Sequence, residues 1–261
     1  MPKPKSGTTK RASDPTLVCV NQATATLGVD FDRLVVALQK FVDDHFAPVW
    51  GVRANLDKAE SPRSGTWTLL FTDDQDSADH AGWLGLHHLE GNPIAKVFVK
   101  PLKHSREKVS VAASHEVAEM LVDPAINMWA TGPEGLLYAY EVCDAVEEET
   151  FDVDGIAMCN FVYPAYFELF RESKSAQFDH KKKLKRPFEI LPRGYATVLK
   201  DGKKVDIPGS DKKEAAFKKE IRTDHRSEYR KRLHLEKPAD TSDFSAIPDN
   251  RKPSTKRKSS K

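Results

Sequence analysis

Residues 115–119 read His-Glu-Val-Ala-Glu, a set of side chains that can bind a metal ion and move a proton. In a helix, positions i and i+4 lie one turn apart on the same face, so His115 and Glu119 can reach the same ion. Imidazole nitrogen and carboxylate oxygen are both ordinary zinc ligands. Glu116 points roughly a quarter-turn away, where a carboxylate can accept a proton from water. The alternative is that these side chains lie on a solvated helix face.

Apolar residues on both sides of this motif favour a buried helix over a solvated one. Buried carboxylates need a hydrogen-bonding or charged partner, because losing water is costly for them. The apolar residues are Ala113, Val117, Met120 and Leu121 on the far side, with Val111, Ala112 and Val122 near the motif.

A second group of carboxylates follows the motif. Glu141 and Asp144 flank Val142 and Cys143 in an apolar context, whereas Glu147–Glu149 indicate an acidic surface stretch. A third protein ligand on a nearby element would complete an open metal site that leaves one position for water. Asp144 can be such a ligand, or it can hold the His115 imidazole by a hydrogen bond.

Three further residues have alternative interpretations. Cys143 with His115 could form a thiol nucleophile and its base, but no spacing supports this, so we expect a structural or free thiol. The adjacent pair His87-His88 is expected mainly at the surface, with contact to a substrate as the alternative.

The motif and the downstream carboxylates together resemble the zincin metallopeptidases, most nearly their gluzincin branch. Those enzymes have H-E-x-x-H on a helix and a downstream glutamate ligand, with an aspartate soon after it. The resemblance implies that His115, Glu119 and Glu141 bind one divalent ion. Asp144 would be a fourth ligand or a hydrogen-bond partner, and Glu116 the general base. Glu119 is the departure, because the family has histidine there.

This departure affects the choice of ion. Two carboxylates and one imidazole already neutralise a zinc ion, which should raise the pKa of the bound water compared with a site holding one carboxylate. Zinc is expected, but Mn²⁺ or Ca²⁺ also fits so oxygen-rich a set. Asp123 or Asp144 as an added ligand would favour these harder ions further.

A longer pattern is similar to a set of bacterial and phage proteins with no established activity. This resemblance implies the cytoplasm of a bacterium or of a phage-infected host cell. The pattern runs over Ser114–Glu119, Asp123-Pro124, Trp129, Glu141–Asp144, Phe161–Phe167 and Pro187–Tyr195.

The hydrophobic pattern predicts strands before the motif helix. That helix is expected over Lys108–Val122, where Pro124 stops it. An earlier helix, capped by Asp30, is expected over Phe31–His45. Predicted strands are Thr16–Gln22, Thr66–Thr72, the edge strand Gly82–His88 and Ile94–Val99. The edge strand is a candidate surface for an extended peptide.

After the motif helix the chain is expected to be rich in β-hairpins. Leu136–Val142 is expected to be a short strand or helix. Hairpins are predicted over Phe151–Met158 and Phe188–Ile207, because Asp154-Gly155 and Asp201-Gly202 are typical of tight hairpin turns.

Charge divides the 261 residues into a mildly acidic body and a basic tail. Residues 211–261 hold 16 Lys/Arg against 9 Asp/Glu, a net charge of +7, and the whole chain carries +2. Such a tail is expected to be solvated, or to make weak, non-specific contacts with nucleic acid. Three widely spaced cysteines do not form a disulfide framework. No apolar run is long enough for a membrane span, so no membrane contact is expected.

Together these features predict an α+β, zincin-like fold with a mixed twisted sheet, an N-terminal helix, the motif helix and extra β-hairpins. We expect a disordered N-terminus over 1–15, a metal-binding domain over 16–208 and a basic helical or disordered tail over 209–261. The predicted function is a metal-dependent, peptidase-type hydrolase acting on a peptide or protein. The alternative is a non-catalytic, metal-stabilised binding or phage structural protein.

Overall fold

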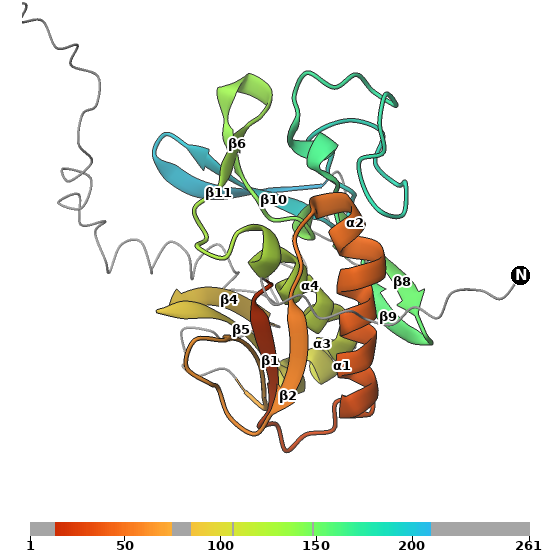
Figure 1. Ribbon diagram of the computed structural model, residues 1–261. Coiled ribbons are helices and arrows are strands. Elements are labelled where there is room, and N and C mark those ends of the chain that lie inside the picture. The colour runs from red at the N-terminus through yellow and green to blue at the C-terminus, as the bar shows by residue number, and fades with distance from the viewer. Residues whose placement is uncertain (1–13, 75–84, 106, 148, 210–261) are drawn as a thin grey trace, which may run out of the picture.

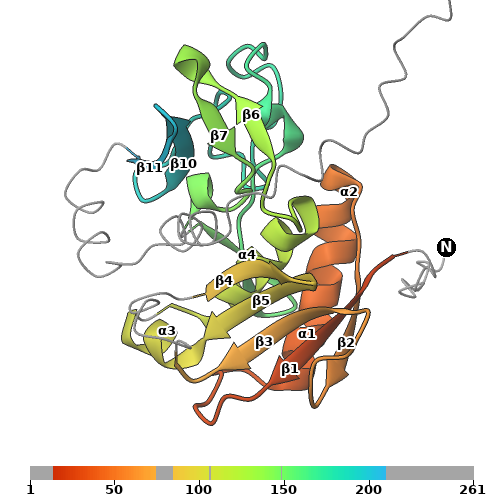
Figure 2. The same ribbon diagram turned by 90° about the vertical axis from the view of Figure 1, so that its left-hand side faces the viewer.

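A computed structural model describes residues 14–74, 85–105, 107–147 and 149–209, which form a mixed α+β fold (Figures 1 and 2). This confirms the predicted α+β class. The predicted disordered N-terminus up to residue 13 and the basic segment 211–261 lie outside the described residues. None of the helices in the described part of the chain combines the length and hydrophobicity needed to cross a membrane.

The larger sheet has five strands in the order β2-β1-β3-β5-β4. β1 is parallel to β2 and β3, and β3 is parallel to β5, whereas the edge strand β4 is antiparallel to β5. The strands are β1 Thr16–Asn21, β2 Asn55–Ala59, β3 Trp67–Thr72, β4 Gly85–Glu90 and β5 Asn92–Phe98.

Helices cover one face of this sheet, where the main hydrophobic core lies (Figure 2). Alternation along β1 sends Leu17 and Cys19 into that core, whereas Val18 and Val20 lie on the opposite face. The helices are α1 Phe31–Lys40, the π-helical turn η1 Phe41–Phe46, α2 Ala47–Trp50, α3 Val99–Ser105 and α4 Val109–Val122.

The first helical segment is longer than predicted. Asp30 caps α1 as expected, because its carboxylate accepts a hydrogen bond from the Arg33 amide at 2.9 Å. The helix was expected over Phe31–His45, and helical structure continues beyond it through α2 to Trp50. Pro48 is tolerated because it lies in the first turn of α2, and Gly51, with φ of 71°, ends the segment.

Two further sheets follow α4. A four-stranded sheet has the order β11-β10-β7-β6, and β8 and β9 form a separate hairpin. These strands are β6 Trp129–Thr131, β7 Leu137–Ala139, β8 Thr150–Val153, β9 Ile156–Cys159, β10 Tyr195–Lys200 and β11 Lys203–Pro208. Short 3₁₀ turns are η3 Pro133–Gly135, η4 Asp144–Val146 and η5 Pro164–Phe167.

Both predicted hairpins form, and each turns at the expected Asp-Gly pair. Asp154 and Gly155 have φ of 52° and 80°, and Asp201 and Gly202 have φ of 50° and 73°, as a tight two-residue turn requires. The second hairpin is shorter than predicted, because its first strand begins at Tyr195 and not at Phe188.

An aromatic cluster joins the first helical segment to the chain after β9. Phe161 is fully buried at its centre, with ring centroids 5.8 Å from Phe41, 4.9 Å from Phe46 and 4.9 Å from His180. The segment after β9 is therefore fixed against the helical layer by ring packing.

Replacing Phe161 by alanine should lower the free energy of unfolding by about 3–5 kcal/mol, because the surrounding rings cannot collapse into the cavity. Urea denaturation monitored by circular dichroism measures this. Phe170→Ala is the matched control, since Phe170 is 77% exposed, and it should change stability by less than about 0.5 kcal/mol. Equal effects of the two variants would contradict the packing described here.

Candidate metal centre

The motif helix α4 is buried because two layers cover it. β4 and β5 lie on one side, and the β8–β9 hairpin lies on the other (Figure 1). Two serines fix the hairpin to the helix: Ser110 Oγ donates to the Ala157 carbonyl at 2.7 Å, and Ser114 Oγ accepts from the Cys159 amide at 2.8 Å. The prediction of a buried helix is confirmed, so the carboxylates on it are removed from water.

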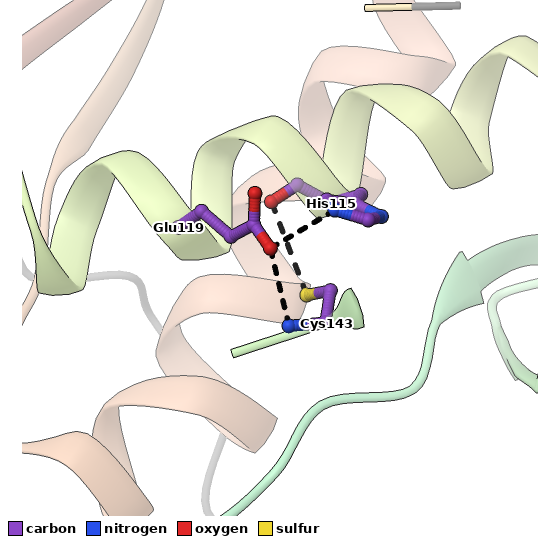
Figure 3. Close-up of side chains that lie close together, drawn as sticks. All are labelled: His115, Glu119 and Cys143. Atoms are coloured by element: carbon purple, nitrogen blue, oxygen red, sulfur yellow. Dashed lines mark hydrogen bonds and ion pairs between the residues drawn. The ribbon is translucent and has the colours of Figure 1, made fainter. Parts of the chain in front are cut away.

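His115 and Glu119 lie together, as the i, i+4 spacing predicts. His115 Nε2 is 3.0 Å from Glu119 Oε1, and both side chains point to the same side of α4 (Figure 3). The same nitrogen is 3.2 Å from Asp144 Oδ1. Glu119 is fully buried and His115 is 4% exposed. One imidazole nitrogen thus faces two buried carboxylates from different parts of the chain.

The segment carrying Glu141 and Asp144 is fixed by backbone hydrogen bonds to later parts of the chain. The Val142 carbonyl accepts from the Val162 amide at 2.7 Å, and the Ala145 carbonyl accepts from the Leu191 amide at 3.0 Å. The acceptor atoms of Glu141 and Asp144 lie within 4.8 Å of each other and of Glu119. The structure therefore brings together all four residues predicted as metal ligands.

Glu116 lies on the sheet side of α4, facing the edge strand. Its Oε2 atom is 3.4 Å from His87 Nδ1 on β4. A Cβ atom at Gly85 would lie 2.7 Å from Glu116 Oε1, so glycine at this position permits the close approach of strand and helix. The expectation that His87 lies at the surface is wrong, because only 5% of it is exposed. Sequence spacing gave no signal for this contact, which depends on strand placement.

Asp123 does not join the group. Its Oδ1 and Oδ2 atoms each accept a backbone hydrogen bond at 3.0 Å, from the amides of Asn127 and Met128 respectively. This carboxylate closes the turn after α4, so its role is structural.

Cys143 lies beside the site with its sulfur directed toward the main chain of α4. Its backbone amide donates to Glu119 Oε1 at 3.3 Å, and its Sγ is 3.9 Å from the carbonyl oxygen of His115 (Figure 3). Sγ is also 3.5 Å from Cys159 Sγ. Burial, with the neighbouring thiol, raises the pKa of Cys143 well above its usual range, which disfavours the thiolate that a nucleophile needs.

The spacing of the donor atoms fits a bound ion. Ligand atoms about 2.0–2.1 Å from a tetrahedral zinc lie about 3.3 Å apart, close to the 3.0 and 3.2 Å separations around His115 Nε2. The set of one nitrogen and several carboxylate oxygens suits zinc and also manganese. Cys143 Sγ also lies within 4.8 Å of the His115 and Glu119 donor atoms, which makes it a candidate ligand that the sequence did not indicate.

Comparisons with protein-family models, with curated proteins and with solved structures found no match for this chain. Function is therefore argued from the chemistry of the site.

The three cysteines should be unreactive in the native protein, because all are buried. Burial, with the nearby Asp57 charge, also raises the pKa of Cys19 to about 12. Titration with a chromogenic disulfide reagent should detect almost no thiol at neutral pH and three after unfolding in urea. One rapidly reacting thiol in the native protein, lost in Cys143→Ser, would instead support a cysteine nucleophile.

Proposed function

We propose that this chain is a metal-dependent hydrolase of the peptidase type, with a zincin-like arrangement of sheet and motif helix. The observation that carries the proposal is the convergence of three side chains beside the buried carboxylate of Glu116. His115 Nε2 lies 3.0 Å from an oxygen of Glu119 and 3.2 Å from an oxygen of Asp144. A mixed sheet whose antiparallel edge strand packs on the motif helix also supports the zincin-like interpretation.

His115, Glu119 and Asp144 would hold the ion, with Glu141 as a further carboxylate ligand. A divalent ion held there supplies Lewis acidity, which makes water a better nucleophile and polarises a carbonyl group. Glu116 precedes Glu119 by almost one turn, and donor atoms of the two carboxylates lie within 4.8 Å of each other, so Glu116 would accept a proton from a water molecule at the site. It would then donate this proton to the leaving amine.

The edge strand β4 offers a way to align a peptide with these residues. β5 is the partner of β4 within the described residues, which leaves the opposite edge of the strand for an added chain. An extended peptide that hydrogen bonds to such an edge becomes a further strand of the sheet. Because β4 packs on α4, a peptide bound along it would lie beside the site.

Replacing Glu116 by glutamine should abolish proton transfer without removing a ligand of the ion at His115. Hydrolysis should fall by about 10²–10⁴-fold, the usual loss when a general base is removed. The measurement is cleavage of unfolded casein, followed by mass spectrometry, with the protein loaded with Zn²⁺ or Mn²⁺. Bound metal is measured in parallel.

Glu172→Gln is the matched control, because it removes the same charge from an exposed loop and should leave cleavage unchanged. Unchanged cleavage in Glu116→Gln would rule out the proposed base. No cleavage by the wild-type protein with either metal would favour the alternative below.

The alternative is a non-catalytic protein in which the ion only stabilises the fold. Complete burial of Glu116 and Glu119 favours it, because structural metal sites are closed to solvent. The buried carboxylate of Glu116 beside the group around His115 favours catalysis, because a general base is needed only for a reaction. Both functions require the same ligands, so cleavage of a substrate decides between them.

Removing the ion should destabilise the protein in either case. A metal ion present at a thousand times its Kd stabilises the folded state by about 4 kcal/mol. A chelator that removes the ion should therefore clearly lower the Tm of the wild-type protein. His115→Ala should have a lower Tm, which a chelator should change less than it changes the Tm of the wild type. Differential scanning calorimetry measures both. A chelator that lowers the Tm of the two proteins equally would show that His115 is not a ligand.

A further inference from the structure

His87, Glu116 and Glu119 form a second group of donor atoms next to the one around His115. His87 Nδ1 lies 3.4 Å from Glu116 Oε2 and 3.8 Å from Glu119 Oε2. The three donor atoms lie within 4.8 Å of one another, and all three residues are buried. One imidazole and two carboxylates are an ordinary ligand set for a divalent cation.

The two oxygens of Glu119 belong to different groups. Oε1 is 3.0 Å from His115 Nε2, whereas Oε2 is 3.8 Å from His87 Nδ1. A carboxylate that presents one oxygen to each of two imidazoles can bridge two ions, which in two-metal sites lie about 3.5–4 Å apart. We propose that His87, Glu116 and Glu119 form a second divalent cation site, and that the Glu119 carboxylate bridges it to the first.

The charge of the region supports two ions over one. Four buried carboxylates, on Glu116, Glu119, Glu141 and Asp144, carry four negative charges when ionised. His87 and His115 are neutral when they bind metal. Two divalent cations would balance the charge of four ionised carboxylates, whereas one would balance half of it.

The edge strand β4 places His87 beside Glu116 and Glu119. Residues i and i+2 of a strand point to the same face, so Gly85 and His87 both face α4. A side chain at Gly85 would meet Glu116, with Cβ only 2.7 Å from Oε1. Glycine at 85 therefore lets Glu116 turn toward the strand, and His87 supplies the nitrogen that completes the group.

A second ion changes what Glu116 can do. A carboxylate that binds a cation is a weaker base, so occupancy of the second site should slow the hydrolysis described above. This consequence rests on the proposed function, but the presence of the second site does not. The first group offers more donors than the second, so the ion at His115 should bind at lower metal concentration.

The experiment is a titration of the metal-free full chain with Mn²⁺, with equilibrium dialysis to count bound ions and electron paramagnetic resonance to detect coupling between them. The wild-type protein should bind two ions per chain, and the second should bring a spin-coupled signal. His87→Ala should bind one uncoupled ion. The exposed His104→Ala is the matched control and should behave as the wild type.

A wild-type protein that saturates at one ion, or a His87→Ala variant that keeps two coupled ions, would overturn the second site. The wild-type spectrum needs no variant to fold, so it tests coupling on its own. Cleavage of casein with one bound ion and no second ion would leave the proposed function standing. Two coupled ions with no cleavage at any Mn²⁺ concentration would support the second site and count against the hydrolase.

Discussion

The cost of burying charge around Glu119 is the constraint on which the rest of the structure depends. Glu119 is fully buried, and Glu116, Glu141 and Asp144 lie in the same region with 5% exposure or less. Carboxylates removed from water need strong compensation, and a protonated imidazole would supply only one positive charge. Cations held by these groups supply more. The metal proposal thus follows from burial as much as from the motif.

The parts of the site that could be predicted from sequence are those whose geometry is local. His115, Glu116 and Glu119 share one helix, and the i, i+4 geometry of a helix is local, so their arrangement follows from spacing. Glu141 and Asp144 could be chosen only by their apolar neighbours. Their position beside α4 depends on contacts between distant parts of the chain, such as the hydrogen bond from the Cys143 amide to Glu119, which no local pattern encodes. His87 was misjudged because its burial depends on the packing of β4 against α4.

The same distinction between local and long-range contacts explains which secondary-structure elements were predicted and which were missed. The Asp-Gly turns were predictable because positive φ at both positions is a local preference. β2 was missed because its residues, Asn-Leu-Asp-Lys-Ala, show little apolar alternation, and its pairing with β1 is what makes it a strand. α3 was not predicted, and its Pro101 is compatible with a helix because proline is tolerated in the first turn.

The contact with His87 gives glutamate at position 119 a possible role that histidine could not fill. Compared with the histidine of the zincin pattern, it weakens a single zinc site, because added negative charge lowers the acidity of bound water. A histidine, however, offers one nitrogen toward a site, and its other nitrogen faces away across the ring. A carboxylate offers two oxygens on one side, and those of Glu119 face His115 and His87 separately. Under the two-ion proposal, the departure from the peptidase pattern and the buried histidine of the edge strand would have one explanation, since a bridge between two ions needs both.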